Sequence, residues 1–252
     1  MSAPARGRLL AYSRYQVGDF LLQRASLPLV LILLIAVPQV YLMRRDMSGG
    51  AFRDARSAGF AHQFFSGGSA FFLYLAAFLG GVAIAPLDRQ PGHYRFYFSK
   101  PVSVRAYYAQ AYLVNGLTLV ALYALMTVVY GTFTAHQSLP RGIAAAALLF
   151  VLIGGLGFLL SALTNWDSLA VALLLVVAVT LQQLVTVTPN PLPRWATALA
   201  RVLPPVVTLD ELRERLFAGY SLGTASLRHV LGYGLGAFAA GFLLYRRVPL
   251  AR

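Results

Sequence analysis

Between Asp88 and Arg105 the chain reads DRQPGHYRFYFSKPVSVR, a polar segment that separates two long runs without a charged residue. The run before it extends from Ser69 to Leu87, and the run after it extends from Ala111 to Phe133. Each run is close to the roughly 20 apolar residues that a helix needs to cross a bilayer. The segment must therefore return to water between two predicted membrane spans.

Part of this polar segment, Ser99-Lys100-Pro101-Val102-Ser103, has the pattern of a helix start. A proline in the first turn fits, because the N–H that it lacks has no partner in the helix. The alternative is an ordinary turn at the membrane surface, with the Lys100 side chain reaching toward the headgroups. A short helix held between two spans would be able to pass a movement into the membrane.

The rest of the chain repeats the alternation of uncharged runs and polar connections. The composition is 58% hydrophobic and only 12% charged, unlike an ordinary soluble domain. Since one charge at a helix centre costs about 2.5–3.5 kcal/mol on insertion scales, excluding charge from six runs predicts an all-α membrane protein. A soluble protein with buried helices is the alternative, but such helices rarely stay uncharged for so long. The predicted spans are residues 27–43, 69–87, 111–133, 143–163, 168–187 and 230–245.

Residues 7–24, ahead of the first predicted span, have helical periodicity. An amphipathic helix at the membrane surface is predicted, and a disordered basic tail is the alternative. The apolar side chains that we expect to anchor this helix are Leu10, Val17, Phe20 and Leu21.

The longest polar connection runs from Pro189 to Leu227, before the last span. Arg194 to Leu203 has helical spacing, Pro204-Pro205 interrupts it, and a second helix follows. Thr208-Leu209-Asp210-Glu211 has the spacing of a capping box, which places the start of the second helix at Thr208. These two short helices are predicted to lie against the outer, extracytoplasmic face of the membrane.

Several kinds of chemistry are missing from the sequence. There is no nucleotide-binding G-x-x-x-x-G-K-[ST] motif, no pair of carboxylates within a span and no cysteine, so no catalytic residue and no metal site is predicted. The net charge of +13 is carried by arginines that flank the spans, which favours anionic lipid over nucleic acid as the counter-charge. Asn115, Gln182 and Gln183 are the main amides within the spans. They line a substrate path or bond neighbouring helices.

Glycines and arginines add two further expectations. Gly232 and Gly236 form a G-x-x-x-G pattern, and Gly154, Gly155 and Gly157 cluster in the fourth span, which predicts close helix packing. The arginines divide almost evenly between the two sides of the predicted topology. Charge therefore leaves the orientation open.

Taken together, the chain resembles a permease subunit of the ABC-2 type, the exporter class of ATP-binding-cassette transporters. The resemblance covers nearly the whole length. Its sharpest part is Gly81 to Gly92 followed by Ser99-Lys-Pro-Val-Ser103 and Arg105. Val104 stands where the family usually has its arginine, and Pro86-Leu87 precedes the acidic residue. The resemblance implies a single permease domain over residues 1–252, in the cytoplasmic membrane of a bacterium, with both termini in the cytoplasm.

The resemblance also implies partners. A second permease copy or a related permease would complete the translocation path, and a separate ATPase would bind ATP and magnesium, since this chain binds no cofactor. The residues implied to contact the ATPase are Ser99, Lys100, Pro101, Val102, Ser103, Arg105, Trp166 and Asp167. The surface helix at residues 7–24 would brace that contact. The uncharged spans suit a small or amphipathic substrate.

Two other functions stay open at this point. An intramembrane enzyme would need polar residues that converge within the spans, and the sequence offers almost none. A non-transporting membrane scaffold or immunity protein differs from a permease only in its partners.

Overall fold

The computed structural model describes residues 13–24, 74–75, 77–79, 104–133, 138–164, 166–188 and 193–244, and every element in these ranges is a helix. The helices of the predicted spans are α5 (Val104–Phe133), α6 (Leu139–Leu149), α7 (Gly155–Leu163), α8 (Asp167–Val187) and α11 (Thr224–Leu244). Two further helices, α9 (Arg194–Val202) and α10 (Val206–Ala218), connect α8 to α11. Two π-helical segments, η1 (Phe20–Arg24) and η4 (Phe150–Gly154), complete the order.

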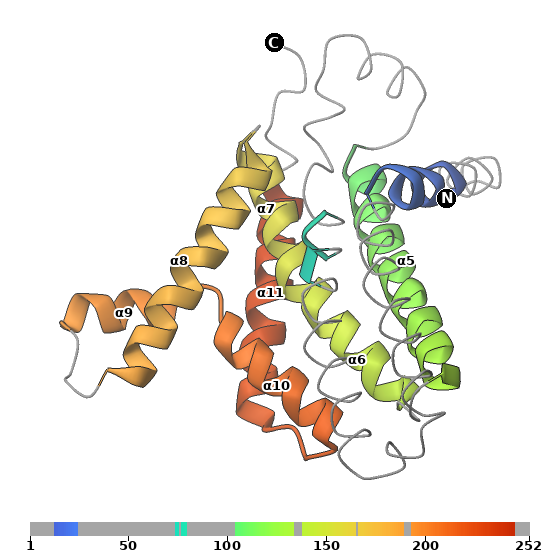
Figure 1. Cartoon of the computed structure of the whole chain (residues 1–252). Coiled ribbons are helices and arrows are strands. Elements are labelled where there is room, and N and C mark those ends of the chain that lie inside the picture. Colours follow the sequence, from blue (N-terminus) through green and yellow to red (C-terminus); the bar gives the residue numbers. More distant parts are fainter. Residues whose placement is uncertain are drawn as a thin grey trace, which may run out of the picture.

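Within the described residues, four helices are long and apolar enough to cross a membrane. They are Ala106–Val128, Leu139–Leu163, Asp167–Val187 and Thr224–Leu244. In Figure 1 the chain descends through α5, returns through α6 and α7, descends through α8, and rises again through α11. The chain is an integral multi-pass membrane protein with an all-helical fold. The predicted span at residues 27–43 and most of that at residues 69–87 lie outside the described residues.

The four helices match the predicted spans but all begin earlier, α8 by the single residue Asp167. The helix α5 begins seven residues before Ala111, α6 four residues before Ile143, and α11 six residues before Val230. The uncharged runs mark only the part of a helix that must lie in hydrocarbon. The extra turns carry charged or interfacial side chains such as Arg141 and Arg228, which a helix end near water tolerates.

The fourth span is one helix with a π-helical segment in its middle. The segments α6, η4 and α7 follow one another without a break from Leu139 to Leu163. At about 1.5 Å per residue, these 25 residues extend for about 38 Å, more than the thickness of the hydrocarbon core. Pro140 lies in the first turn, where its missing N–H costs no helical hydrogen bond.

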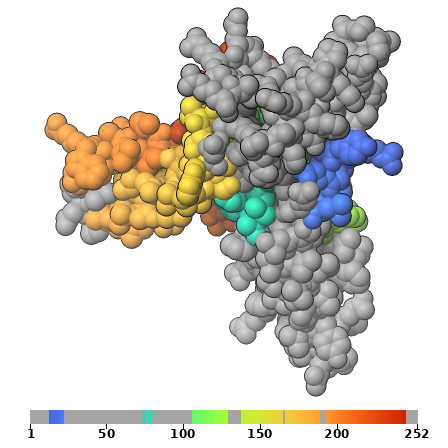
Figure 2. All heavy atoms as spheres, turned by 90° about the horizontal axis from the view of Figure 1, so that it is seen from above, coloured from blue at the N-terminus to red at the C-terminus, as the bar shows by residue number. Residues whose placement is uncertain are grey.

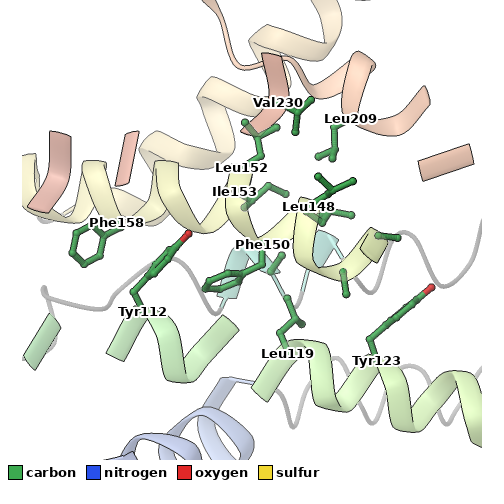
Figure 3. Close-up of a cluster of buried hydrophobic side chains, with 14 of the residues drawn as sticks. Tyr112, Leu119, Tyr123, Leu148, Phe150, Leu152, Ile153, Phe158, Leu209 and Val230 are labelled. Carbon is green, nitrogen blue, oxygen red and sulfur yellow. The ribbon is translucent and has the colours of Figure 1, made fainter. Parts of the chain in front are cut away.

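The described core forms where this fourth span meets α5, α10 and α11. Figure 3 shows the rings of Tyr112 and Phe150 side by side between α5 and the fourth span. The Tyr112 ring stacks on Phe238 of α11 with centroids 4.4 Å apart, and it lies 4.8 Å from Phe150 and 5.6 Å from Phe158. Aromatic packing of this kind is directional as well as apolar, so it sets how the three helices meet at this level of the bundle.

The connection between α8 and α11 contains the two predicted short helices, with one difference. The second helix, α10, begins at Val206 directly after the two prolines, and no side chain caps its start. The predicted capping box at Thr208 to Glu211 is therefore wrong, because these residues already lie inside the helix. The two prolines have no N–H to donate and cannot continue α9. The helix α10 begins at Val206, the first residue after them that has an N–H.

The helix α10 packs on the bundle, whereas α8 and α9 project from it. Leu209 and Leu212 of α10 are each 1% exposed. In the view from above, α8 and α9 form a lobe on the side opposite the N-terminal helix (Figure 2). The large apolar side chains on α9 remain exposed, namely Trp195, Leu199 and Val202.

Candidate coupling face

Three segments that the sequence links to an ATPase partner lie at the same end of the bundle. Figure 1 shows the N-terminal helix crossing the first turns of α5, with the turn between α7 and α8 at the same level. The helix α10 lies toward the opposite end, and α9 projects from the bundle at about its middle height. We call the first end the coupling face, defined by residues 13–24, the start of α5 at Val104, and residues 164, 166 and 167 of the turn.

The N-terminal helix is fixed to the bundle by its apolar side. Residues 13–19 are α-helical and continue into η1. The Phe20 side chain is 1% exposed and belongs to the same hydrophobic cluster as Tyr108 and Ala111 of α5, and Leu21 packs against that cluster. Val17 is partly buried, and Leu10 lies outside the described residues. Because Phe20 and Leu21 face the bundle, they hold the helix in place.

The exposed side of this helix carries different residues. Tyr15 and Leu22 are each 78% exposed, and Arg14 is exposed as well. Exposed large apolar side chains at a membrane boundary favour contact with lipid or with a partner. The periodicity of the sequence marked the anchoring residues but not these two, since they break the apolar and polar division of the helix.

Only the end of the polar segment after the second predicted span can be described. Ser99, Lys100, Pro101, Val102 and Ser103 lie outside the described residues. The backbone of Val104 and Arg105 is helical, so α5 begins three residues after Pro101. The predicted short helix remains a prediction, and any such helix would lead directly into the span formed by α5.

The turn between α7 and α8 separates its two predicted contact residues. Trp166 is 73% exposed, whereas Asp167 is 2% exposed. One carboxylate oxygen of Asp167, Oδ1, accepts hydrogen bonds from the Ser168 backbone N–H at 2.7 Å and from the Ser168 hydroxyl at 3.3 Å. A carboxylate in the first turn of a helix also interacts favourably with the helix dipole. Trp166 therefore offers contact area, and Asp167 holds the start of α8.

The amides within the spans occupy three different surroundings. Asn115 is 5% exposed in the interior of α5. Gln182 uses both ends of its amide within the chain: Nε2 donates to the carbonyl oxygens of Ala200 at 3.2 Å and Pro204 at 2.8 Å, and Oε1 accepts from the Val207 backbone N–H at 3.1 Å. Gln183, next to it, is exposed. Gln182 thus ties α8 to both short helices.

Two buried polar features escaped the sequence interpretation. Arg213 is 6% exposed and pairs with Asp210 through Nη2 to Oδ1 at 2.8 Å and Nε to Oδ1 at 3.0 Å. The opposite charges three residues apart were the available signal. The Tyr112 hydroxyl is buried and has no hydrogen-bond partner among the residues that the structure describes. Among the residues that the structure describes, no group of three or more acidic or histidine side chains could hold a metal ion.

No protein-family profile, no curated protein and no solved structure matches this chain.

Proposed function

We propose that this chain is the membrane-embedded subunit of an ABC-2 type exporter, which forms a translocation path with a second permease and couples to a separate ATPase. The sequence resemblance is the basis of the proposal. The four long apolar helices support it, because a path across a bilayer requires several packed spans. The absence of a nucleotide-binding motif in the sequence assigns ATP hydrolysis to the partner.

The observation that carries the proposal is the shared position of the three segments at the coupling face. A soluble ATPase approaches a permease from one side of the membrane, so its contacts must lie at one end of the bundle. The N-terminal helix, the start of α5 and the exposed Trp166 meet this condition (Figure 1). Had they lain at different ends, one partner would be unable to reach them all.

The packing of α5 offers a route from this face into the membrane. Near its start, α5 shares a cluster with Phe20, and further along it packs on α6, where a Cβ on Gly142 would lie 3.0 Å from Thr127 Oγ1. A shift of the segment before α5 would therefore move α5 and α6 together. Rigid-body shifts of packed helices are the usual means of alternating access.

The orientation of the coupling face tests the proposal directly. The chain has no cysteine, so a single introduced thiol reports without background. We expect Ser103→Cys to be protected from a membrane-impermeant maleimide in intact cells, and Tyr220→Cys, near the opposite end and 71% exposed at wild type, to be labelled. Labelling of Ser103→Cys from outside would exclude contact with a cytoplasmic ATPase.

A second test addresses the coupling itself. The chain, purified from its native membranes in lipid nanodiscs, should retain an ATPase subunit with a Walker A motif, and that complex should hydrolyse ATP faster than the ATPase subunit alone. A chain that turned over a substrate without any partner would contradict the proposal.

A further inference from the structure

The fourth span changes its helical type at the middle. Its first part, α6, and its last part, α7, are α-helical, whereas η4 between them is a π-helical turn over Phe150–Gly154. A π-turn contains one residue more than the α-helical turn it replaces, and it interrupts the regular ladder of hydrogen bonds. Such interruptions are among the few identifiable causes of bending in a helix.

The two parts of the span pack on different partners. The part that is lower in the view of Figure 1, α6, packs mainly on α5 and α10. Its Gly142 faces α5 so closely that a Cβ atom there would lie 3.0 Å from Thr127 Oγ1 and 3.2 Å from Tyr123 Cε1. The contact leaves no room for sliding, so α6 and the lower half of α5 move together.

The upper part, α7, packs mainly on α11. A Cβ atom on Gly155 would collide with the Gly234 carbonyl oxygen, and one on Gly241 would lie 3.0 Å from the Leu159 Cα. Backbones in such close contact act as one unit, since small residues let the helices interlock. The segment η4 also packs on α11, where a Cβ atom on Gly234 would collide with the Val151 carbonyl oxygen. The boundary between the two units therefore falls where α6 ends and η4 begins.

The side chain at this boundary sits between two glycines. A Cβ atom on Gly116 of α5 would lie 2.5 Å from the Phe150 ring, and one on Gly154 would lie 3.0 Å from it. Figure 3 shows the Phe150 ring between the fourth span and α5, beside Tyr112. With no side chain on either glycine, the buried Phe150 ring packs directly on both backbones, so it marks the point where α5 and the two parts of the fourth span meet.

We propose that η4 is a hinge, at which α7 and α11 pivot as one unit relative to α6 and the lower half of α5, with Phe150 at the pivot and α10 in contact with both units. The role of this hinge in alternating access rests on the proposed function. The evidence for the hinge itself is the packing of these helices, which does not depend on that function.

Distances between spin labels on the full chain in lipid nanodiscs test the hinge without any ATPase. All label sites are exposed leucines replaced by cysteine: Leu163 and Leu243 for the upper unit, and Leu125 and Leu139 for the lower unit. We expect the Leu163–Leu125 distance, which crosses η4, to be more broadly distributed than either Leu163–Leu243 or Leu125–Leu139. Equal widths for all three pairs would overturn the hinge.

Deleting Val151 removes one residue from the π-turn and restores a continuous α-helix, while Phe150 and Gly155 keep their faces. The deletion should narrow the Leu163–Leu125 distribution to the width of the within-unit pairs. Val151→Ala, which keeps the π-turn, should leave it broad. A deletion variant that folds and stays broad would contradict the hinge. If the deletion does not fold, the three wild-type distributions decide the question alone. A rigid fourth span in a chain that still copurifies with its ATPase would refute the hinge and leave the proposed function intact.

Discussion

Gly155 of α7 lies so close to Gly234 of α11 that a Cβ atom on Gly155 would collide with the Gly234 carbonyl oxygen. A Cβ atom on Gly234 would in turn collide with the Val151 carbonyl oxygen, so the backbones of α11 and of the fourth span are in direct contact at both glycines. The sequence marked Gly232 and Gly236 as the packing pair, yet no atom of the described part of the chain lies within 4 Å of a Cβ atom on either of them. The close contact is made by the glycine between the two.

Gly155→Ala should therefore destabilise the bundle by about 1–3 kcal/mol, because the added methyl group forces α7 and α11 apart. Gly232→Ala is the matched control, since it adds the same methyl group to a helix where the space is open. Thermal unfolding in detergent should separate the two variants. Equal melting temperatures would mean that the helices do not meet at this glycine pair.

Gln182→Leu should release the two short helices from α8. The substitution removes hydrogen bonds to Ala200, Pro204 and Val207, and it leaves the Val207 N–H without its acceptor. Because this hydrogen bond is only partly buried, we expect a loss near the lower end of the roughly 1–3 kcal/mol that an unsatisfied buried group costs, about 1 kcal/mol.

Gln183→Leu is the control for this change, because the neighbouring amide is exposed. Trypsin cleavage at Arg201, within α9, should become faster in Gln182→Leu than in wild type or in Gln183→Leu. Identical cleavage in both variants would show that the Gln182 amide does not hold α9 and α10.

The sequence predicted the positions of helices well where those helices lie in the hydrocarbon of the bilayer. Charge-free runs located four helices to within seven residues at each end, because a charged side chain is costly only inside the bilayer. The same criterion says nothing about where a helix begins in the interface. Arg141 and Arg228 therefore lie inside helices that the uncharged runs had shortened.

Side-chain roles were harder to predict, because they depend on which helix face meets which neighbour. Gln182 and Gln183 are the same residue type at adjacent positions, and only the chain path through α9 and α10 makes one a structural link and leaves the other exposed. Trp166 and Asp167 differ in the same way. A charge-free run does not encode these long-range contacts.

Asp210→Asn should weaken the hold on the buried Arg213 guanidinium. The Arg213 side chain is 7% exposed and that of Asp210 is 47% exposed, so solvent already screens part of the interaction. We expect a loss of about 1 kcal/mol, less than for a fully buried pair. Glu214→Gln, on the exposed side of the same helix, should change the melting temperature much less. A larger drop in melting temperature for Glu214→Gln than for Asp210→Asn would show that the exposed charge of Glu214, and not the Asp210–Arg213 pair, stabilises the helix.

Pro101→Asp and Arg105→Glu should uncouple ATP hydrolysis from transport while the chain still inserts into the membrane. The first places a negative charge just before α5, and the second places one in its first turn. The measurement is the ratio of substrate exported to ATP hydrolysed in proteoliposomes that contain the ATPase subunit. An unchanged ratio in either variant would count against a contact at this segment.

Trp166→Ala and Asp167→Asn should affect different properties although the residues are adjacent. Trp166 is exposed at the coupling face, and a large aromatic side chain at the centre of an interface contributes about 2 kcal/mol, or roughly thirty-fold in affinity. Trp166→Ala should therefore weaken binding of the ATPase subunit by that factor without lowering the melting temperature. Asp167→Asn replaces a buried carboxylate at the start of α8, which should cost about 0.5–1 kcal/mol of stability and leave the affinity unchanged. Isothermal titration of the ATPase subunit into nanodiscs, paired with thermal unfolding, measures both. If the two variants lost affinity in parallel with stability, the turn would serve the fold and not the partner.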